Sequence, residues 1–166
     1  MIQNCSEQIL EDVVRVDLVK ASLCDLPIPF NIKVQEMAGT KVVDEQTVDR
    51  IGAASLSLAY SVQDGDDGEI DSAPVLKQSE KRQTAGIVVT HDLQVPVTAG
   101  YQATRTAVAE MQEEDFHVVL TTGEGERYLC YALPNTSQVA LDEQGVNQQM
   151  TVKVTVQSVS HVVRLT

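Results

Sequence analysis

The chain has 166 residues, a formal net charge of −12 and few aromatic residues, with four Tyr, two Phe and no Trp. This length fits a single domain over residues 1–166 with enough apolar side chains to bury a core. The acidic balance argues against sequence-specific nucleic-acid binding, because affinity for phosphates comes from clustered Lys and Arg and stacking on bases needs exposed aromatic rings. No apolar run is long enough to predict a membrane-spanning helix.

The N-terminus and the cysteines indicate a protein made in the cytosol. The first ten residues lack the basic and apolar regions of a secretory signal. The three cysteines, Cys5, Cys24 and Cys130, are odd in number and sparse, so they predict no disulfide framework. Cys130 lies in a predicted strand and is expected to be a small buried side chain. A bridge between Cys5 and Cys24 is left open.

Alternating apolar and polar residues predict most of the elements as strands. Residues 13–20 alternate clearly, with Val14, Val16 and Leu18 expected on one face. Residues 40–54 fit either a short helix or a strand edge. The same alternation predicts further strands over residues 30–36, 56–60, 87–97 and 150–161, the last of them long and expected to be central and half-buried.

Residues 63–84 are predicted to form a long polar loop. The segment 64–71 carries five carboxylates and two glycines, and residues 78–84 are polar throughout. Loops of this length inside compact domains are usually functional or disordered. The segment is therefore a candidate for presentation to a partner.

One helix and one hairpin are predicted in the second half. Ala103, Ala107 and Met111 lie four residues apart with Val108 beside them, which predicts a helix over 102–112. The acidic residues that follow have the wrong sign for a helix C-terminus, so the helix is expected to end early or fray. The hairpin pairs residues 116–121 with 127–132 around a Gly-containing loop at 122–126, and a polar connection follows Pro134 and Asn135.

These elements predict a mainly β fold. About seven or eight strands, joined by turns and accompanied by one short helix, favour an antiparallel β-sandwich or barrel. The 25 valines agree with this, since a β-branched side chain fits a pleated sheet well.

The acidic segment is the best metal candidate, although a weak one. Asp64, Asp66, Asp67, Glu69 and Asp71 could gather around calcium, which takes six to eight oxygen ligands. The spacing does not match an EF-hand, and a solvated loop is the simpler interpretation. No cofactor is predicted.

No catalytic motif is present. His91, His117 and His161 each fall in a strand-like segment without the local spacing of metal ligands, so three separate strand residues are favoured over a zinc site. Ser160 and His161 are neighbours whose side chains point to opposite faces of a strand. A small hydrolase assembled from distant His and Asp residues is the weakest alternative for the function.

The layout resembles small structural proteins of tailed bacteriophages and prophages, of the tail-tube, tail-completion and connector group. The segments that carry the likeness are Ile9–Leu18, Arg127–Asn135 and Thr151–Ser160. The resemblance implies a β-sandwich or barrel with one packed helix and extended loops that reach neighbouring subunits. It implies no catalytic residues.

The resemblance therefore implies a non-enzymatic virion protein. Such a protein acts by self-assembly into a ring or tube, contacts neighbouring virion proteins and is assembled in the host cytoplasm. The alternative is a soluble β-sandwich binding module that presents loops 63–84 and 122–126 to a protein partner or calcium.

Overall fold

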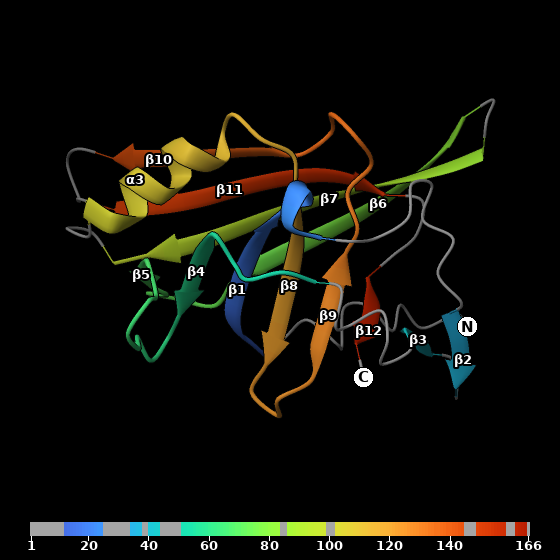
Figure 1. Ribbon diagram of the computed structural model, residues 1–166, viewed down its shortest axis with the longest axis horizontal. Coiled ribbons are helices and arrows are strands. Elements are labelled where there is room, and N and C mark those ends of the chain that lie inside the picture. The colour runs from blue at the N-terminus through green and yellow to red at the C-terminus, as the bar shows by residue number, and fades with distance from the viewer. Residues whose placement is uncertain are drawn as a thin grey trace.

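Two β-sheets and one α-helix make up the fold in the computed structural model, which describes residues 12–24, 34–37, 40–43, 51–83, 86–98, 102–144, 149–158 and 162–165 (Figure 1). The eight strands of the first sheet lie in the order β2 (Val34–Met37), β3 (Thr40–Val43), β12 (Val163–Leu165), β9 (Arg127–Cys130), β8 (Phe116–Thr122), β1 (Val13–Lys20), β4 (Leu56–Ala59) and β5 (Gly68–Glu69). The four strands of the second lie in the order β10 (Gln138–Gln144), β11 (Gln149–Ser158), β7 (Gly86–Val97) and β6 (Val75–Gln83). The helix is α3 (Gln102–Met111), and a single 3-10 turn, η1 (Ala21–Leu23), follows β1.

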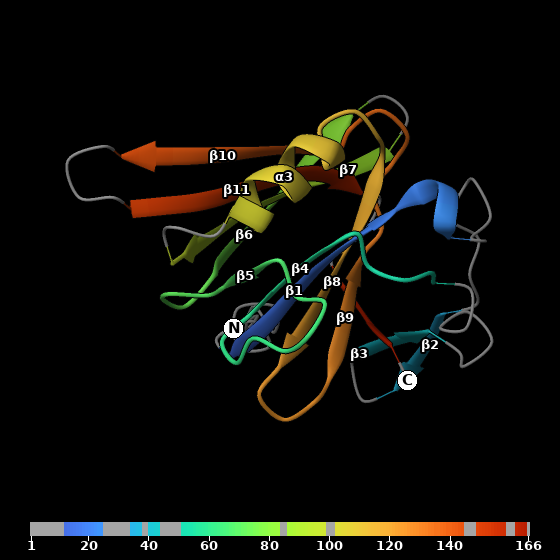
Figure 2. The same cartoon turned by 60° about the vertical axis from the view of Figure 1, so that its left-hand side comes forward.

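The strands of the second sheet run across those of the first, and one hydrophobic core lies between the sheets (Figures 1 and 2). On β11 every second residue is buried, and Val152, Val154 and Val156 face this core while Lys153 points to solvent. Phe116, at the start of β8, is fully buried against the same core. Each such side chain stabilises the fold by about 1.5–3 kcal/mol through removal of apolar surface from water.

The helix packs against the core between the two sheets (Figure 2). Its buried side is formed by Thr104, Ala107, Val108 and Met111. Ala103 is exposed, so its predicted place on the buried side is wrong, because Thr104 takes that place and donates its hydroxyl to the backbone oxygen of Asp67. The helix ends at Met111, as expected from the acids that follow.

The prediction of a mainly β fold with one helix is confirmed. The predicted strands correspond to β1, β4, β7 and β11, and the predicted hairpin to β8 and β9. The ambiguous segment 40–54 begins with β3, and the predicted strand 30–36 overlaps β2 from residue 34 onwards. The described strands form two separate open sheets and exceed the expected seven or eight.

Two predicted polar segments prove to contain strands. The prediction of a single long loop over 63–84 is wrong for half of that segment, because the two-residue β5 and the nine-residue β6 lie within it. The polar connection expected after Asn135 contains β10. Both β6 and β10 are edge strands of the four-stranded sheet, and an edge strand with an exposed face needs few apolar residues.

The predicted face of β1 is also corrected at one residue. The register with β8 shifts between Val13 and Arg15, so Val14 sits at an irregularity and is only partly buried. Val16 and Leu18 are buried as predicted. Predictions for Cys5 and His161 fall outside the described residues.

Candidate functional site

The acidic segment is tied to the body of the fold through Asp66. The Arg15 guanidinium donates to Asp66 Oδ1 at 2.7 Å, and the backbone N–H of Gln63 donates to Oδ2 at 2.9 Å. Burial is the largest single effect and would raise the pKa of Asp66, but the hydrogen bonds from Arg15 and the Gln63 N–H together with the charge of Arg15 outweigh it and leave the pKa below the ordinary value. Arg15 also contacts Asp17, and its own pKa is raised, chiefly by the hydrogen bond to Asp66. Asp66 is therefore a structural ion-pair partner.

Asp67 is held by backbone groups of β4. Its Oδ2 accepts the N–H of Ser57 at 2.9 Å, and its own N–H donates to the Ser57 carbonyl at 2.8 Å. Burial raises the pKa of Asp67 despite the Ser57 N–H, and the nearby charges of Asp66 and Glu110 raise it further. The segment between β4 and β5 is thus fastened to both β4 and α3.

The five acids predicted as a calcium site do not converge. Asp66 and Asp67 are turned to protein partners, while Asp64 and Asp71 are exposed. In the part of the chain that the structure describes, no three His, Cys, Asp or Glu side chains gather in a way that could hold a metal ion. The geometry gives the calcium alternative no support.

The described histidines occupy separate buried positions. His91 on β7 is 1% exposed, and its Nδ1 lies 4.0 Å from the Cys130 sulfur. Cys130 is buried as predicted, and burial raises the pKa of its thiol to about 12. A thiol with that pKa stays protonated at neutral pH, so this pair packs as part of the core.

His117 on β8 is a neutral buried base. Its Nδ1 accepts the backbone N–H of Ala132 at 3.0 Å, and its ring stacks on Tyr131 with centroids 4.4 Å apart. Burial lowers its pKa to about 4, against a small opposing effect of Asp115. The neutral ring therefore carries its proton on Nε2 at physiological pH.

The hairpin tip at 122–126 is the second loop predicted to face a partner. Gly125 adopts a φ of 88°, a region that suits glycine in a turn. Tyr128 donates to Glu126 at 2.6 Å, and burial together with this hydrogen bond raises the pKa of Tyr128 to about 12. Arg164 of β12 also pairs with Glu126 at 3.4 Å. Glu126 thus links the base of the tip to Tyr128 of β9 and Arg164 of β12. Glu124 is exposed.

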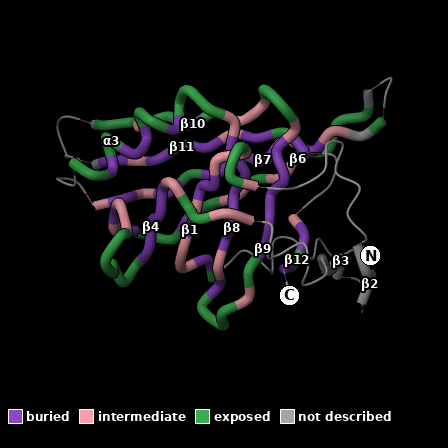
Figure 3. The backbone as a smooth tube through the Cα atoms, viewed as in Figure 1, coloured by how far each residue is buried: buried purple, intermediate pink, exposed green. Residues whose placement is uncertain are grey.

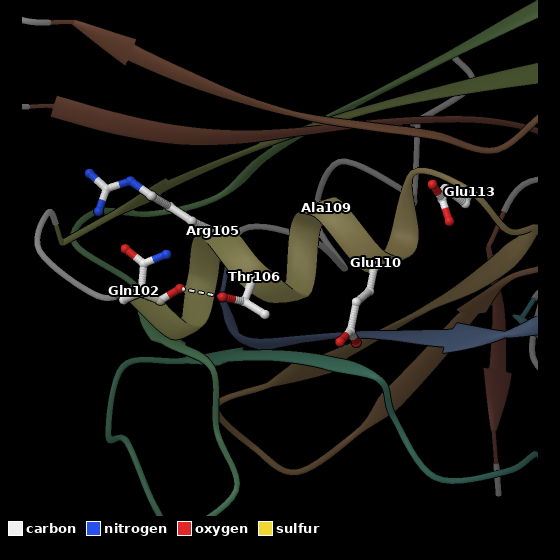
Figure 4. Close-up of a pocket in the computed structure, with 6 residues that line it drawn as sticks. All are labelled: Gln102, Arg105, Thr106, Ala109, Glu110 and Glu113. Carbon is white, nitrogen blue, oxygen red and sulfur yellow. Dashed lines mark hydrogen bonds between the residues drawn. The ribbon is translucent and has the colours of Figure 1, made fainter.

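A shallow depression follows the exposed side of α3 (Figure 4). Arg105 points toward β10, where it pairs with Glu143 at 2.7 Å, and Glu110 points to the other side of the helix. The depression is lined by Gln102, Arg105, Thr106, Ala109, Glu110 and Glu113. Opposite charges that diverge in this way do not form a convergent binding site.

The most distinctive surface is the free end of the β6–β7 hairpin, which projects past the other strands (Figure 1). We call its described residues, 80–83 and 86–89, the arm. Among the described residues β7 pairs with β11 from Val89 onwards, whereas its pairing with β6 continues to Gly86 opposite Gln83. As far as the described residues show, the arm beyond Val89 is therefore a two-stranded ribbon. Glu80, Lys81 and Arg82 are exposed in it, and Figure 3 colours this part of β6 as exposed.

The arm also differs from the rest of the surface in charge. Most cationic side chains among the described residues are ion-paired with a carboxylate: Arg15, Lys20, Arg105, Lys153 and Arg164. Lys77, Lys81, Arg82 and Arg127 form no ion pair in that part of the chain, and the first three lie on β6. Sequence reasoning missed this surface, although a Lys-Arg pair in so acidic a chain was its visible signal.

No family model, curated protein or solved structure matches this chain significantly. No helix within the described ranges is long and apolar enough to cross a membrane.

Proposed function

We propose that this chain is a non-enzymatic structural protein of a tailed phage or prophage virion, in the tail or tail connector, and that it assembles with copies of itself into a ring or tube. The phage assignment rests on the resemblance of the sequence pattern. The observation that supports self-assembly is the arm with its edge strand β6.

An edge strand with an exposed outer side favours association. Among the described residues the backbone of β6 pairs only with β7, and Val162 contacts it through the Gln78 side chain, so within that part of the chain the outer side of the strand accepts no further strand and can take one from a partner. A two-stranded ribbon is marginally stable alone in water, so a projecting one gains stability when a partner covers it. Natural proteins usually shorten or cover such edges unless they use them.

The alternative binding module would use part of the same surface, since β6 lies within residues 63–84. A foreign protein partner and a second copy of the chain both fit an open edge. The oligomeric state of the purified protein separates the two functions.

The test is light scattering coupled to size exclusion, over protein concentrations from micromolar to near millimolar. Self-assembly predicts a mass that rises with concentration and ring-shaped or tubular particles in electron micrographs. A protein that stays monomeric over this whole range contradicts the proposal and favours the binding module. Portal, tape-measure and terminase genes beside the coding gene would support the phage assignment, and their absence would remove it.

A further inference from the structure

We propose that copies of this chain join head to tail, with the basic arm of one copy docked on the acidic end of the next. This inference rests on the proposed self-assembly and specifies the two surfaces that meet. Three features of the described residues lead to it: the position of the arm, the position of the exposed acids and the charge pattern of β6.

The arm lies at one end of β7. The ladder between β6 and β7 terminates with Gln83 opposite Gly86, the first residue of β7. Lys81 and Arg82 are adjacent strand residues, so their side chains leave opposite faces of the ribbon. Both are exposed and form no ion pair among the described residues, so the arm offers a free cation on each face.

Exposed acids lie at the other end of β7. Val97, the last residue of β7, bridges Ile70 and pairs with Met150, which is opposite Glu143 of β10. Asp71, next to Ile70, is therefore at this end together with Asp142 and Glu143. β5 directly precedes Ile70, so the β4–β5 connection, which carries Asp64, leads into this end of β7. We call Asp64, Asp71, Asp142 and Glu143 the acidic end.

The two surfaces are well separated. The length of β7, Gly86–Val97, corresponds to roughly 36 Å at the usual rise of a strand. An arm at one end and its complement at the other cannot meet within one copy. They meet between copies, in a heterologous contact that repeats and closes into a ring or continues as a tube.

The acidic end keeps uncompensated charge. Asp142 pairs with Lys153 and Glu143 with Arg105, but both pairs are exposed and worth little. Asp64 and Asp71 are exposed and form no ion pair in the described part of the chain. The carboxylates of Asp64 and Asp71 are therefore available to pair with a cation of another copy.

Charge also argues against one symmetric contact between two β6 strands, the antiparallel pairing centred on Ser79. An antiparallel pairing centred on Ser79 would set Lys77 of one copy opposite Lys81 of the other, in both halves of the contact. Like charges directly opposite one another destabilise a strand pair. With a net charge of −12, a second copy of the chain supplies the acidic partner that the arm needs.

The test is a charge exchange between two variants. One carries Lys81→Glu and Arg82→Glu in the arm, and the other carries Asp64→Lys and Asp71→Lys at the acidic end. Each alone sets like charges against one another and is expected to lower the apparent association constant about tenfold or more. Mixed together, they restore opposite charges at every contact, so assembly is expected to return. Arg127→Glu and Glu124→Lys, on the β8–β9 hairpin, are single charge reversals of each sign that serve as controls, and both are expected to leave assembly unchanged.

The outcomes are read by light scattering, with circular dichroism and melting temperature to confirm that each variant is folded. If the wild type assembles and either charge-reversed variant assembles equally well, the head-to-tail contact is wrong while self-assembly stands. Loss in both variants without recovery in the mixture also overturns it. If the wild type never assembles, the result contradicts the proposed self-assembly itself. Weakening of wild-type assembly between about 0.05 and 0.5 M salt is expected as well.

Discussion

One carboxylate of the acidic segment, that of Asp66, forms an ion pair that holds the fold together, although the surrounding residues are polar and charged. Asp66 lies 51 residues from Arg15 in the sequence, yet the two side chains meet at 2.7 Å. Composition predicted a solvated loop, because local spacing gives no information about a cation on a distant strand. Asp64, two residues away, remains exposed as predicted. Which acids in such a run become buried is decided by tertiary contacts alone.

Asp66→Asn tests this role. The substitution removes the charge opposite a partly buried Arg15, so we expect about 1–2 kcal/mol lower unfolding free energy in urea titrations. Because the pKa of Asp66 is lowered in the fold, the ion pair stabilises the protein at neutral pH and this contribution disappears in acid. The difference between variant and wild type should therefore shrink at low pH. Asp64→Asn is the control and should change stability by less than about 0.5 kcal/mol.

His117 makes stability depend on pH in a different range. The pKa of His117 is about 4 in the folded protein, whereas an ordinary histidine, as in the unfolded chain, has a pKa of 6.5. Between these two pH values the unfolded chain therefore binds a proton that the native chain does not. Stability contributed by the neutral ring is complete above pH 6.5 and falls as the pH drops. The expected loss between pH 7 and pH 5 is about 2 kcal/mol.

His117→Asn isolates that contribution. An Asn side-chain oxygen can accept the Ala132 N–H in place of Nδ1 without titrating. Urea unfolding at pH 7 and pH 5 should give a smaller pH-dependent loss for the variant than for the wild type. Equal losses in the two proteins would show that other groups cause the dependence.

At the scale of elements, burial decides which strands sequence reasoning finds. β11 alternates Val152, Val154 and Val156 with polar residues because one face packs on the core. β6 and β10 are edge strands whose residues face solvent over much of their length. Their sequences are therefore mostly polar, and both segments were predicted to be loops or connections. The helix was found because four side chains of one stripe are buried, although Thr104 took the place expected for Ala103.

Val154→Ala and Lys153→Ala test this contrast on adjacent residues of one strand. Val154 is 2% exposed in the middle of β11, so removing two methyl groups should cost about 2–3 kcal/mol of unfolding free energy. Lys153 faces solvent in an exposed pair with Asp142, so its loss should cost less than about 0.5 kcal/mol. Comparable costs for the two would mean that β11 does not pack as described.

At the scale of the whole molecule, the sequence contains the charges but not their geometry. Twelve basic and 24 acidic residues give the net charge by counting. That Lys81 and Arg82 lie at the opposite end of β7 from Asp71 follows only from the register of β6 with β7 and from the bridge between Ile70 and Val97. Parts of both the arm and the acidic end fall within residues 63–84, so the prediction of one loop there gave no indication that the two surfaces are far apart. Folding that segment into β5 and β6 converts one polar stretch into two distant surfaces.

If the arm serves association, the sandwich should fold without it. Replacing residues 81–88 with Asn-Gly joins Glu80 to Val89, which are already paired, through a turn that suits a two-residue hairpin. Within the described residues the ladder between β7 and β11 begins at Val89, and the replacement leaves it intact, so the melting temperature should stay within about 2 °C of the wild type. Light scattering should show a monomer at concentrations where the wild type assembles. A large fall in melting temperature would instead make the arm part of the fold, and unchanged assembly would move the contact elsewhere on the molecule.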